Sequence, residues 1–198
     1  MRTILVIFLS FLVLSGTSTM LVSNTGYADT GYPKDVQLVP DRYPVDTLAI
    51  VGYHNQIECM AKNIFFEAGN QELAGKIAVA HVVINRVESD RYPDTICGVV
   101  YDAQVSKWHK ENTGKIVPLR DRCQFSWYCD GQPDVIPPGT SWENALAVAE
   151  EIVTNFYNDE LGVDITDGAM YYHATYVKPY WAKSLTRIAR IGDHIFYK

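Results

Sequence analysis

Residues 58–102 read ECMAKNIFFEAGNQELAGKIAVAHVVINRVESDRYPDTICGVVYD, and their pattern of apolar side chains predicts two packed helices. The first helix is expected from about Asn55, because apolar residues recur there at the three- and four-residue intervals of an amphipathic helix: Ile57, Met60, Ala61, Ile64, Phe65 and Ala68. Gly69-Asn70 ends it, since both residue types tolerate the left-handed conformation at a helix C-terminus. The second helix is expected from about Glu72 to Val87, with its apolar stripe at Leu73, Ile77, Ala80, Ile84 and Val87.

The later part of the chain predicts sheet. CQFSWYCDG, residues 123–131, is typical of a strand or hairpin closed by Asp130-Gly131. A third helix is expected to begin at Thr140, where Thr140 and Glu143 have the spacing of a capping box. The aromatic-rich last third predicts strand and loop. We therefore predict one α+β domain over residues 55–198, with a helical pair first and β-hairpin and sheet material later.

Composition favours a single globular domain and argues against nucleic-acid binding. The 198 residues are 47% hydrophobic and 20% charged, which is ordinary for a globular protein. Seventeen Lys and Arg stand against 23 Asp and Glu, a formal net charge of −6. Nucleic-acid-binding domains usually carry a net basic surface, so we expect no nucleic-acid partner.

The N-terminal segment predicts export. Arg2 precedes the apolar run 4–14 (ILVIFLSFLVL), and Gly26-Tyr27-Ala28 places small residues at a cleavage site, so residues 1–28 are interpreted as a signal peptide. The alternative is a retained membrane anchor over residues 4–22, which is close to the length that spans a bilayer. Residues 29–54 are expected to be a flexible lead-in. We expect a periplasmic or secreted monomer.

The four cysteines allow three pairings, and an exported chain favours disulfides. Cys123 and Cys129 bracket QFSWY, which suits a local clip, and this leaves Cys59 to pair with Cys97. A nucleophilic cysteine with a distant histidine is the alternative. No CxxC or HExxH pattern occurs, so we expect neither a metal nor a cofactor.

Glu67 stands out on the first predicted helix. At about 100° per residue it lies about 20° from Met60 and about 60° from Ile64, whereas Glu58 lies on the opposite side. A carboxyl on an apolar face must be paired or have a raised pKa, and a raised pKa is what a general acid needs. The alternative is a helix-end Glu that bends outward to water. Asn85-Arg86 closes the second helix, where we expect capping and ion pairing.

Three blocks of the sequence resemble one known family. The stretch 58–102, the segment RCQFSWYCDG at 122–131, and the closing residues 171–198 (YYHATYVKPYWAKSLTRIARIGDHIFYK) are similar to the SleB/CwlJ-type cell-wall hydrolases, the spore-cortex-lytic enzymes and their phage and proteobacterial relatives. The family's usual helix end, Glu-Ala-Arg-Gly-Glu, stands here as Glu67-Ala68-Gly69-Asn70-Gln71. The Arg and the second Glu are absent, which puts any substrate contact of that Arg in doubt.

This resemblance implies a lysozyme-like or transglycosylase-like fold that acts on the glycan strands of peptidoglycan, with Glu67 as the catalytic acid. A lytic transglycosylase needs one carboxyl, which protonates the leaving oxygen and then takes the proton of the muramic C6 hydroxyl. A hydrolysing muramidase usually needs a second carboxylate, for which the sequence offers Asp102, Asp130 and Asp134. A peptidoglycan-binding protein without turnover is a further alternative.

A glycan-binding cleft needs flat aromatic faces and polar side chains. The candidates for substrate contact are Gln124, Ser126, Trp127, Tyr172, His173 and Trp181. For Trp127 a buried place in a sheet is an equal alternative. For His173 we favour a hydrogen-bonded position in the core over a role in the site.

Overall fold

A computed structural model describes residues 45–198, with side chains from residue 49 onward. The predicted signal peptide (or the alternative anchor at 4–22) and the first part of the predicted lead-in lie outside the described residues. Among the residues that are described, no helix is both long enough and apolar enough to cross a membrane.

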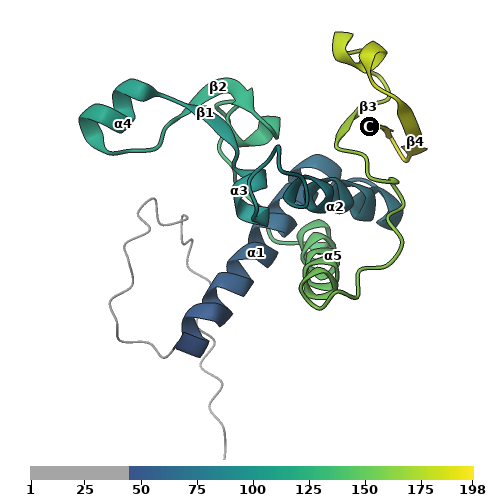
Figure 1. Ribbon diagram of the computed structural model, residues 1–198, viewed down its shortest axis with the longest axis horizontal. Helices are drawn as coiled ribbons and strands as arrows, with labels where there is room; N and C mark the ends of the chain where they lie inside the picture. The colour runs from purple at the N-terminus through teal and green to yellow at the C-terminus, as the bar shows by residue number, and fades with distance from the viewer. Residues whose placement is uncertain (1–44) are drawn as a thin grey trace, which may run out of the picture. The chain divides into compact units, whose positions relative to one another are not determined.

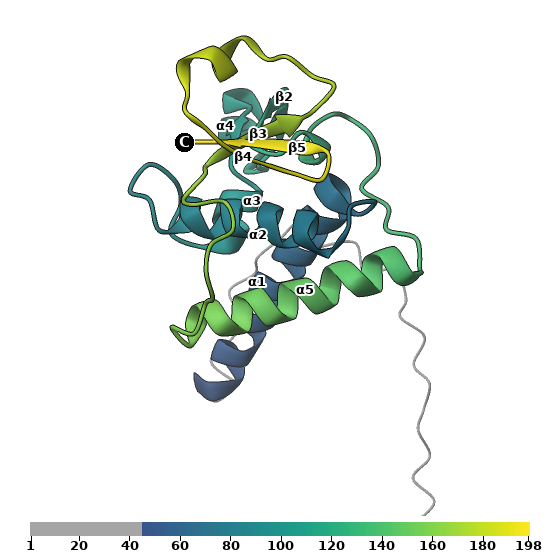
Figure 2. The same cartoon turned by 90° about the vertical axis from the view of Figure 1, so that its right-hand side faces the viewer.

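Three long helices form one layer of the domain (Figures 1 and 2). They are α1 (Val45–Ala68), α2 (Leu73–Val87) and α5 (Thr140–Tyr157), and the short α3 (Ile96–Val100) packs on α1 and α2. The apolar faces of these helices meet in a common core, whose largest fully buried members include Met60, Ile64, Ile84 and Val153. The predicted helical pair is confirmed, and α1 ends directly before Gly69-Asn70 as expected.

The helix α2 is buried on nearly all sides, which the predicted single stripe did not capture. Ala78, Val79, Ala80, Val82 and Val83 have no exposed surface, because α2 contacts α1, α3, α5 and strand β4. Leu73, the first member of the predicted stripe, is instead 59% exposed at the start of the helix. A helix enclosed by neighbours loses the one-sided pattern from which a stripe is identified.

The helix α1 begins at Val45, ten residues before the predicted start at Asn55 and inside the predicted lead-in. The part of α1 before Asn55 contacts α5 through Tyr53. The Tyr53 hydroxyl lies 2.6 Å from the hydroxyl of Thr154, and the Tyr53 ring meets the Tyr157 ring edge-on at 5.9 Å. Tertiary contact therefore extends the helix beyond its sequence signal.

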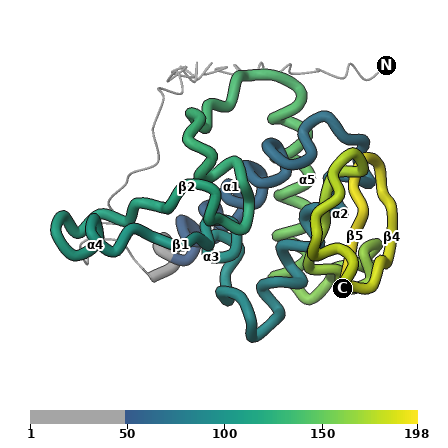
Figure 3. The backbone as a smooth tube through the Cα atoms, turned by 90° about the horizontal axis from the view of Figure 1, so that it is seen from above, coloured from purple at the N-terminus to yellow at the C-terminus, as the bar shows by residue number. Residues whose placement is uncertain are grey.

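Two small antiparallel sheets complete the α+β fold and confirm the predicted class. The first joins β3 (Tyr171–Ala174), β4 (Arg187–Ile191) and β5 (His194–Tyr197) in the order β3-β5-β4, with the short 3₁₀ helix η2 (Tyr180–Ser184) between β3 and β4. The second pairs β1 (Ala103–Val105) with β2 (Pro118–Cys123), and the helix α4 (Lys107–Thr113) lies between them in sequence. Figure 3 shows α4 and these two strands on the side of the domain opposite β4 and β5.

The segment 123–131 is not the hairpin that its sequence predicted. Cys123 ends β2 and pairs with Ala103 of β1, and Ser126–Tyr128 then forms the 3₁₀ turn η1. Both predicted disulfides are confirmed: Cys59 pairs with Cys97, and Cys123 pairs with Cys129 across η1. The predicted local disulfide is therefore correct, although the loop that it closes contains a 3₁₀ turn rather than a hairpin.

The helix α5 begins at Thr140 as predicted, but its capping box does not form. The N-cap residue is Gly139, at φ 146°, and no side chain caps the helix. Ser141, the second residue of the helix, donates its hydroxyl to the carbonyl oxygen of Gly69 at 3.0 Å. The start of α5 is thus tied to the end of α1, where Glu67 lies.

Removing the Cys59–Cys97 disulfide should destabilise the domain more than removing Cys123–Cys129. The bridged residues are 38 and 6 positions apart, respectively. Loop-closure entropy then predicts losses of about 4 and about 2 kcal/mol. Urea unfolding of the two double Cys→Ser variants measures both losses. A larger loss for the Cys123–Cys129 pair would contradict this account.

Candidate active site

Glu67 lies in the last turn of α1, where the helical layer meets the sheet. The Tyr172 hydroxyl, from the middle of β3, donates to Glu67 Oε2 at 2.9 Å. Glu67 remains partly accessible as a residue, while its carboxyl is desolvated by the surrounding protein. A carboxyl that is desolvated yet reachable is suited to exchange a proton with a bound substrate.

Burial raises the pKa of Glu67 above its ordinary value, and two neighbours oppose this effect. The hydrogen bond from Tyr172 and the positive charge of Arg86 both lower the pKa, but burial is the largest influence. Burial, together with the negative charge of Glu67, raises the pKa of Tyr172 well above its ordinary value, so Tyr172 stays a donor. Burial therefore favours the neutral acid more than water would, and the anion has two partners once it forms.

Arg86 is held rigidly beside this carboxyl. It is 5% exposed, and its Nε and Nη2 donate to the carbonyl oxygen of Met170 at 3.0 and 2.8 Å. Its guanidinium lies over the rings of Phe125 and Tyr92, at 4.9 and 5.3 Å from their centroids. Arg86 is thus part of the electrostatic environment of Glu67, rather than the helix cap that its position predicted.

Asp164 anchors the loop that leads into β3. Its carboxylate accepts hydrogen bonds from His81 Nδ1 at 2.7 Å and Asn85 Nδ2 at 2.9 Å, two side chains one turn apart on α2. The Thr166 backbone N–H and hydroxyl also donate to it, each at 2.7 Å. Because β3 carries Tyr172, these hydrogen bonds to Asp164 hold in place the segment that leads to the Tyr172 hydroxyl.

Trp127 belongs to the core beside the site and does not present an open face. Its ring stacks on Phe66, the residue before Glu67, with centroids 4.7 Å apart and planes at 18°. Its Nε1 donates to Oδ1 of the fully buried Asn63 at 3.1 Å, and only 7% of Trp127 is exposed. Trp127 is therefore buried as its alternative predicted, although it lies in the turn η1 rather than in a sheet, and its contact with a sugar stays a prediction.

The other predicted contact residues divide between different surfaces. Gln124 and Ser126 are exposed at the start of η1. His173 lies on the face of β3 opposite Tyr172, because successive strand residues point to opposite sides. Trp181, in η2, contacts the His173 ring with centroids 5.6 Å apart. His173 bonds Ala174 O and the Tyr197 hydroxyl, both at 2.9 Å, as its hydrogen-bonded alternative predicted. Of the six, Tyr172 alone bonds Glu67.

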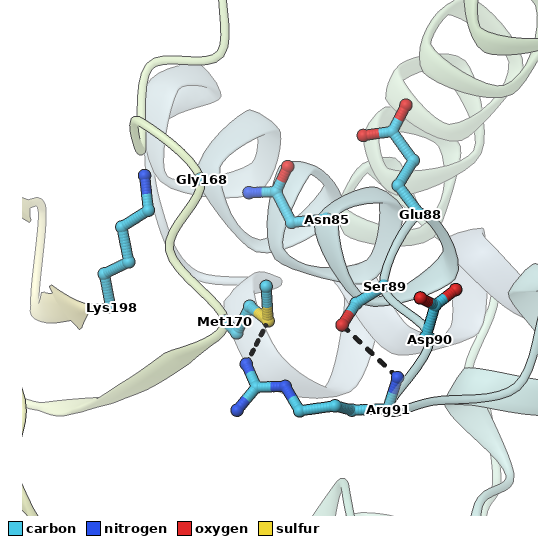
Figure 4. Close-up of a pocket in the computed structure, with 8 residues that line it drawn as sticks. All are labelled: Asn85, Glu88, Ser89, Asp90, Arg91, Gly168, Met170 and Lys198. Atoms are coloured by element: carbon cyan, nitrogen blue, oxygen red, sulfur yellow. Dashed lines mark hydrogen bonds between the residues drawn. The ribbon is translucent and has the colours of Figure 1, made fainter.

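Two shallow hollows lie near the sheet, and neither is lined by Glu67. Trp181 and Tyr171 line one of them with Ser184 and Leu185. The other lies between the end of α2 and the C-terminus, and Figure 4 shows its charged lining, in which Arg91 Nη2 approaches Met170 Sδ. The chemistry of the carboxyl, rather than the depth of a hollow, singles out the Glu67 site.

None of the three candidate second carboxylates influences Glu67 in the part of the chain that the structure describes. The groups that shift its pKa are Tyr172 and Arg86. Asp130 accepts the backbone N–H of Gln132 at 2.7 Å in a turn, and burial and Asp130 together raise the pKa of Asp134. Asp102 lies after α3, where its carbonyl accepts the backbone N–H of Gln124.

Comparison with known proteins places the chain in a family. The sequence pattern of the family described as Cell Wall Hydrolase matches residues 70–197, well over half of the chain. The chain therefore belongs to the cell wall hydrolase family of enzymes. The match begins three residues after Glu67.

Curated relatives carry the name spore cortex-lytic enzyme. One from Halalkalibacterium halodurans is 31% identical over 143 residues, which cover 72% of this chain and 34% of the relative. One from Bacillus cereus is 29% identical over 149 residues, covering 74% of this chain and 46% of the relative. The matched region thus spans between about a third and about half of these relatives.

Two solved structures are also similar. The catalytic domain of the Bacillus cereus SleB protein is 25% identical, with a TM-score of 0.49 over 85% of this chain and 99% of that one. The catalytic domain of the germination-specific lytic transglycosylase SleB from Bacillus anthracis is 26% identical, with a TM-score of 0.49 over 81% and 100%.

Two of the three departures from the expected helix-end motif, Gly69 and Gln71, have structural counterparts. At Gly69, a Cβ would collide with the backbone oxygen of Phe65 and approach Ser141 Oγ to 3.1 Å, so no larger residue fits without a shift. Gln71 holds the β4–β5 turn: its Oε1 accepts the Asp193 backbone N–H at 2.9 Å and its Nε2 donates to Asp193 Oδ2 at 3.2 Å. A neutral amide can do both, because it is a donor and an acceptor.

Asp164→Asn should destabilise the protein in a pH-dependent way. Hydrogen bonds hold the pKa of Asp164 well below its ordinary value in the folded state. Its stabilising contribution is therefore full above the unfolded pKa of about 3.9 and is lost as the pH falls toward the lower folded value. At pH 7 we expect a loss of about 1–3 kcal/mol in the free energy of unfolding.

Urea unfolding of the parent and Asp164→Asn at several pH values between 7 and 2.5 measures this difference. It should narrow as the pH falls below about 4, because Asp164 in the unfolded parent then takes up a proton while Asp164 in the folded parent stays charged. A difference that stays constant over that range would show that the charge of Asp164 contributes nothing to stability.

Proposed function

We propose that the chain is an exported lytic transglycosylase that cleaves the MurNAc–GlcNAc β-1,4 bond of peptidoglycan, with Glu67 as its single general acid and base. The observation that carries this proposal is the Glu67 carboxyl, which is desolvated, has a raised pKa and bonds Tyr172. Membership of the cell wall hydrolase family supports the substrate class. The expected signal peptide supports action in the periplasm or outside the cell.

In the first step, the neutral Glu67 transfers its proton to the glycosidic oxygen as the bond from this oxygen to muramic C1 breaks. Tyr172 donates to Oε2, so Oε1 is the oxygen that carries the transferable proton. The sugar becomes oxocarbenium-like while Glu67 becomes an anion. The hydrogen bond from Tyr172 and the charge of Arg86 then favour the newly formed carboxylate.

In the second step, the Glu67 carboxylate takes the proton of the muramic C6 hydroxyl as that oxygen bonds to C1. The product is a 1,6-anhydro ring, and Glu67 returns to its neutral form. Burial favours this return, because desolvation disfavours the charged form of the carboxyl. One carboxyl thus completes the cycle without a second acid.

Glu67→Gln should lower the rate of peptidoglycan cleavage at least about 100-fold, since it removes the transferable proton while keeping the size of the side chain. The matched control is Glu58→Gln, on the same helix but exposed and ion-paired with Lys62 at 2.8 Å. Release of soluble fragments from purified peptidoglycan measures both rates. A Glu67→Gln rate within threefold of the parent would remove Glu67 from the site.

Mass spectrometry of the parent's products in the same assay identifies the acceptor of the muramic residue. We expect 1,6-anhydromuramyl ends. Reducing muramic ends as sole product would establish the hydrolysing alternative, with Asp102, Asp130 or Asp134 as the partner to test next. No released product, together with retained binding, would establish a non-catalytic binding protein.

Tyr172→Phe should shift the pH–rate profile to higher pH. The hydrogen bond from Tyr172 lowers the pKa of Glu67, so its removal raises that pKa further. The active form of Glu67 is the neutral acid, and activity falls as the pH rises through its pKa. The descending limb of kcat/KM against pH should therefore move upward in the variant.

The matched control for this experiment is Tyr176→Phe, which removes a hydroxyl from a residue that is 86% exposed. Its profile should coincide with that of the parent. A descending limb in Tyr172→Phe that moves to lower pH, or does not move, would show that this limb does not report Glu67.

A further inference from the structure

Positive charge is concentrated in one part of this acidic protein. Residues 103–123, which we call the basic arm, comprise β1, α4 and β2 with their connections. The arm contains five basic residues, Lys107, Lys110, Lys115, Arg120 and Arg122, against Glu111 and Asp121. Its net charge of +3 contrasts with −6 for the whole chain, so the remainder of the protein is strongly acidic.

The charges of the basic arm are available to a partner. The side chains of Lys107 and Arg120 are 87% and 75% exposed. Each has one loose ion pair, Lys107 with Glu111 at 3.7 Å and Arg120 with Asp121 at 3.9 Å, and exposed pairs of this kind are weak and screened by salt. Within the described residues, the other three bases form no ion pair.

Flat and apolar side chains are exposed among these charges. Trp108 is 62% exposed on α4, Ile116 is 61% exposed after it, and Leu119 is 42% exposed on β2. No residue of α4 is buried, so this helix contributes nothing to a core. In Figures 1 and 3, α4 lies at the far end of the arm, away from α2 and α5.

The basic arm is connected to the candidate active site by a short path. The strand β2 ends at Cys123, whose disulfide to Cys129 encloses η1. From η1, Trp127 stacks on Phe66, the residue directly before Glu67. A polymer held by the arm would therefore be held at a fixed position relative to the Glu67 carboxyl.

We propose that the basic arm is a second binding surface for peptidoglycan, which engages the acidic stem peptides and a sugar face of a strand that is cut at Glu67. This rests on the proposed function. Stem peptides carry free carboxylates, so an acidic enzyme is repelled by its own substrate unless positive charge is placed where the strand must lie. Exposed Trp108 supplies the flat face on which a pyranose ring can stack.

The composition of the arm favours a polar polymer over a lipid surface. A helix that lies on a membrane presents a continuous apolar face, whereas α4 has seven residues and one large apolar side chain, Trp108. Ile116 and Leu119 belong to other segments, and Glu111 and Asp121 interrupt the basic residues. Spaced positive charges with amides and hydroxyls between them match a polymer of sugars and acidic peptides.

The test measures binding separately from cleavage. The full chain carrying Glu67→Gln is sedimented with insoluble peptidoglycan, with and without Lys107→Gln, Lys110→Gln and Lys115→Gln combined. We expect the triple change to weaken binding about tenfold at low salt, as the sum of three exposed charge interactions, and the difference to fade at high salt. The matched control neutralises three exposed bases elsewhere: Lys178, Lys183 and Arg190.

Three further measurements identify the partner. Peptidoglycan whose stem peptides have been removed by an amidase should bind the chain with the unchanged arm and the triple variant with the same affinity. Trp108→Ala should weaken binding severalfold, by an amount that does not depend on salt, because stacking is not a charge interaction. Vesicles of phosphatidylglycerol should show no binding that depends on the arm.

Cleavage in the Glu67-containing chain then shows whether the surface serves the active site. The triple variant should raise KM for whole peptidoglycan, leave kcat unchanged, and leave the rate on a short disaccharide-peptide dimer unchanged. Equal binding by the parent and the triple variant would overturn the proposal. So would binding to vesicles, or to glycan without stem peptides, that the triple change weakens. Because these binding assays use Glu67→Gln, their outcome does not depend on whether Glu67 is the catalytic acid.

Discussion

The hydrogen bond between Tyr172 and Glu67 joins the two halves of this fold, and much of the remaining structure maintains it. Glu67 is placed by α1, whereas Tyr172 is placed by β3, 105 positions later in the chain. Asp164, bound to His81 and Asn85, holds the loop before β3 against α2. Arg86 binds the carbonyl oxygen of Met170, the residue before that strand. The carboxyl is desolvated because helix and sheet meet around it.

This arrangement places competing influences on one titrating group. Burial favours the neutral acid, and Tyr172 and Arg86 favour the anion. A group that must first donate and then accept a proton needs both states within reach, so a balance of this kind suits acid–base chemistry better than either extreme. The same logic explains why Tyr172 is a useful partner: its own raised pKa keeps it a donor throughout.

Much of the fold could be read from the sequence where a signal is local. The period of Ile57–Ala68 and the stop at Gly69-Asn70 depend on neighbouring residues, and they were predicted correctly. The start of α5 at Thr140 was also correct, although the capping box from which it was predicted does not form. The helical wheel also singled out Glu67, because its place among apolar neighbours follows from about 100° per residue. By the same measure Arg86 lies about 20° from Val79 on α2, so its burial was predictable in principle.

What remained out of reach depends on contacts between distant segments. No local pattern shows that Tyr53 bonds Thr154 and so extends α1, or that Cys123 ends a strand whose partner is β1. Trp127 and Trp181 are alike as sequence signals, yet one is buried against Phe66 and the other lines a hollow on the sheet. The period and spacing of the sequence therefore determined which residues share a face of a helix. The packing of helix against sheet decided which faces meet. This packing could not be predicted, because the pKa and exposure of a side chain depend on neighbours from distant parts of the chain.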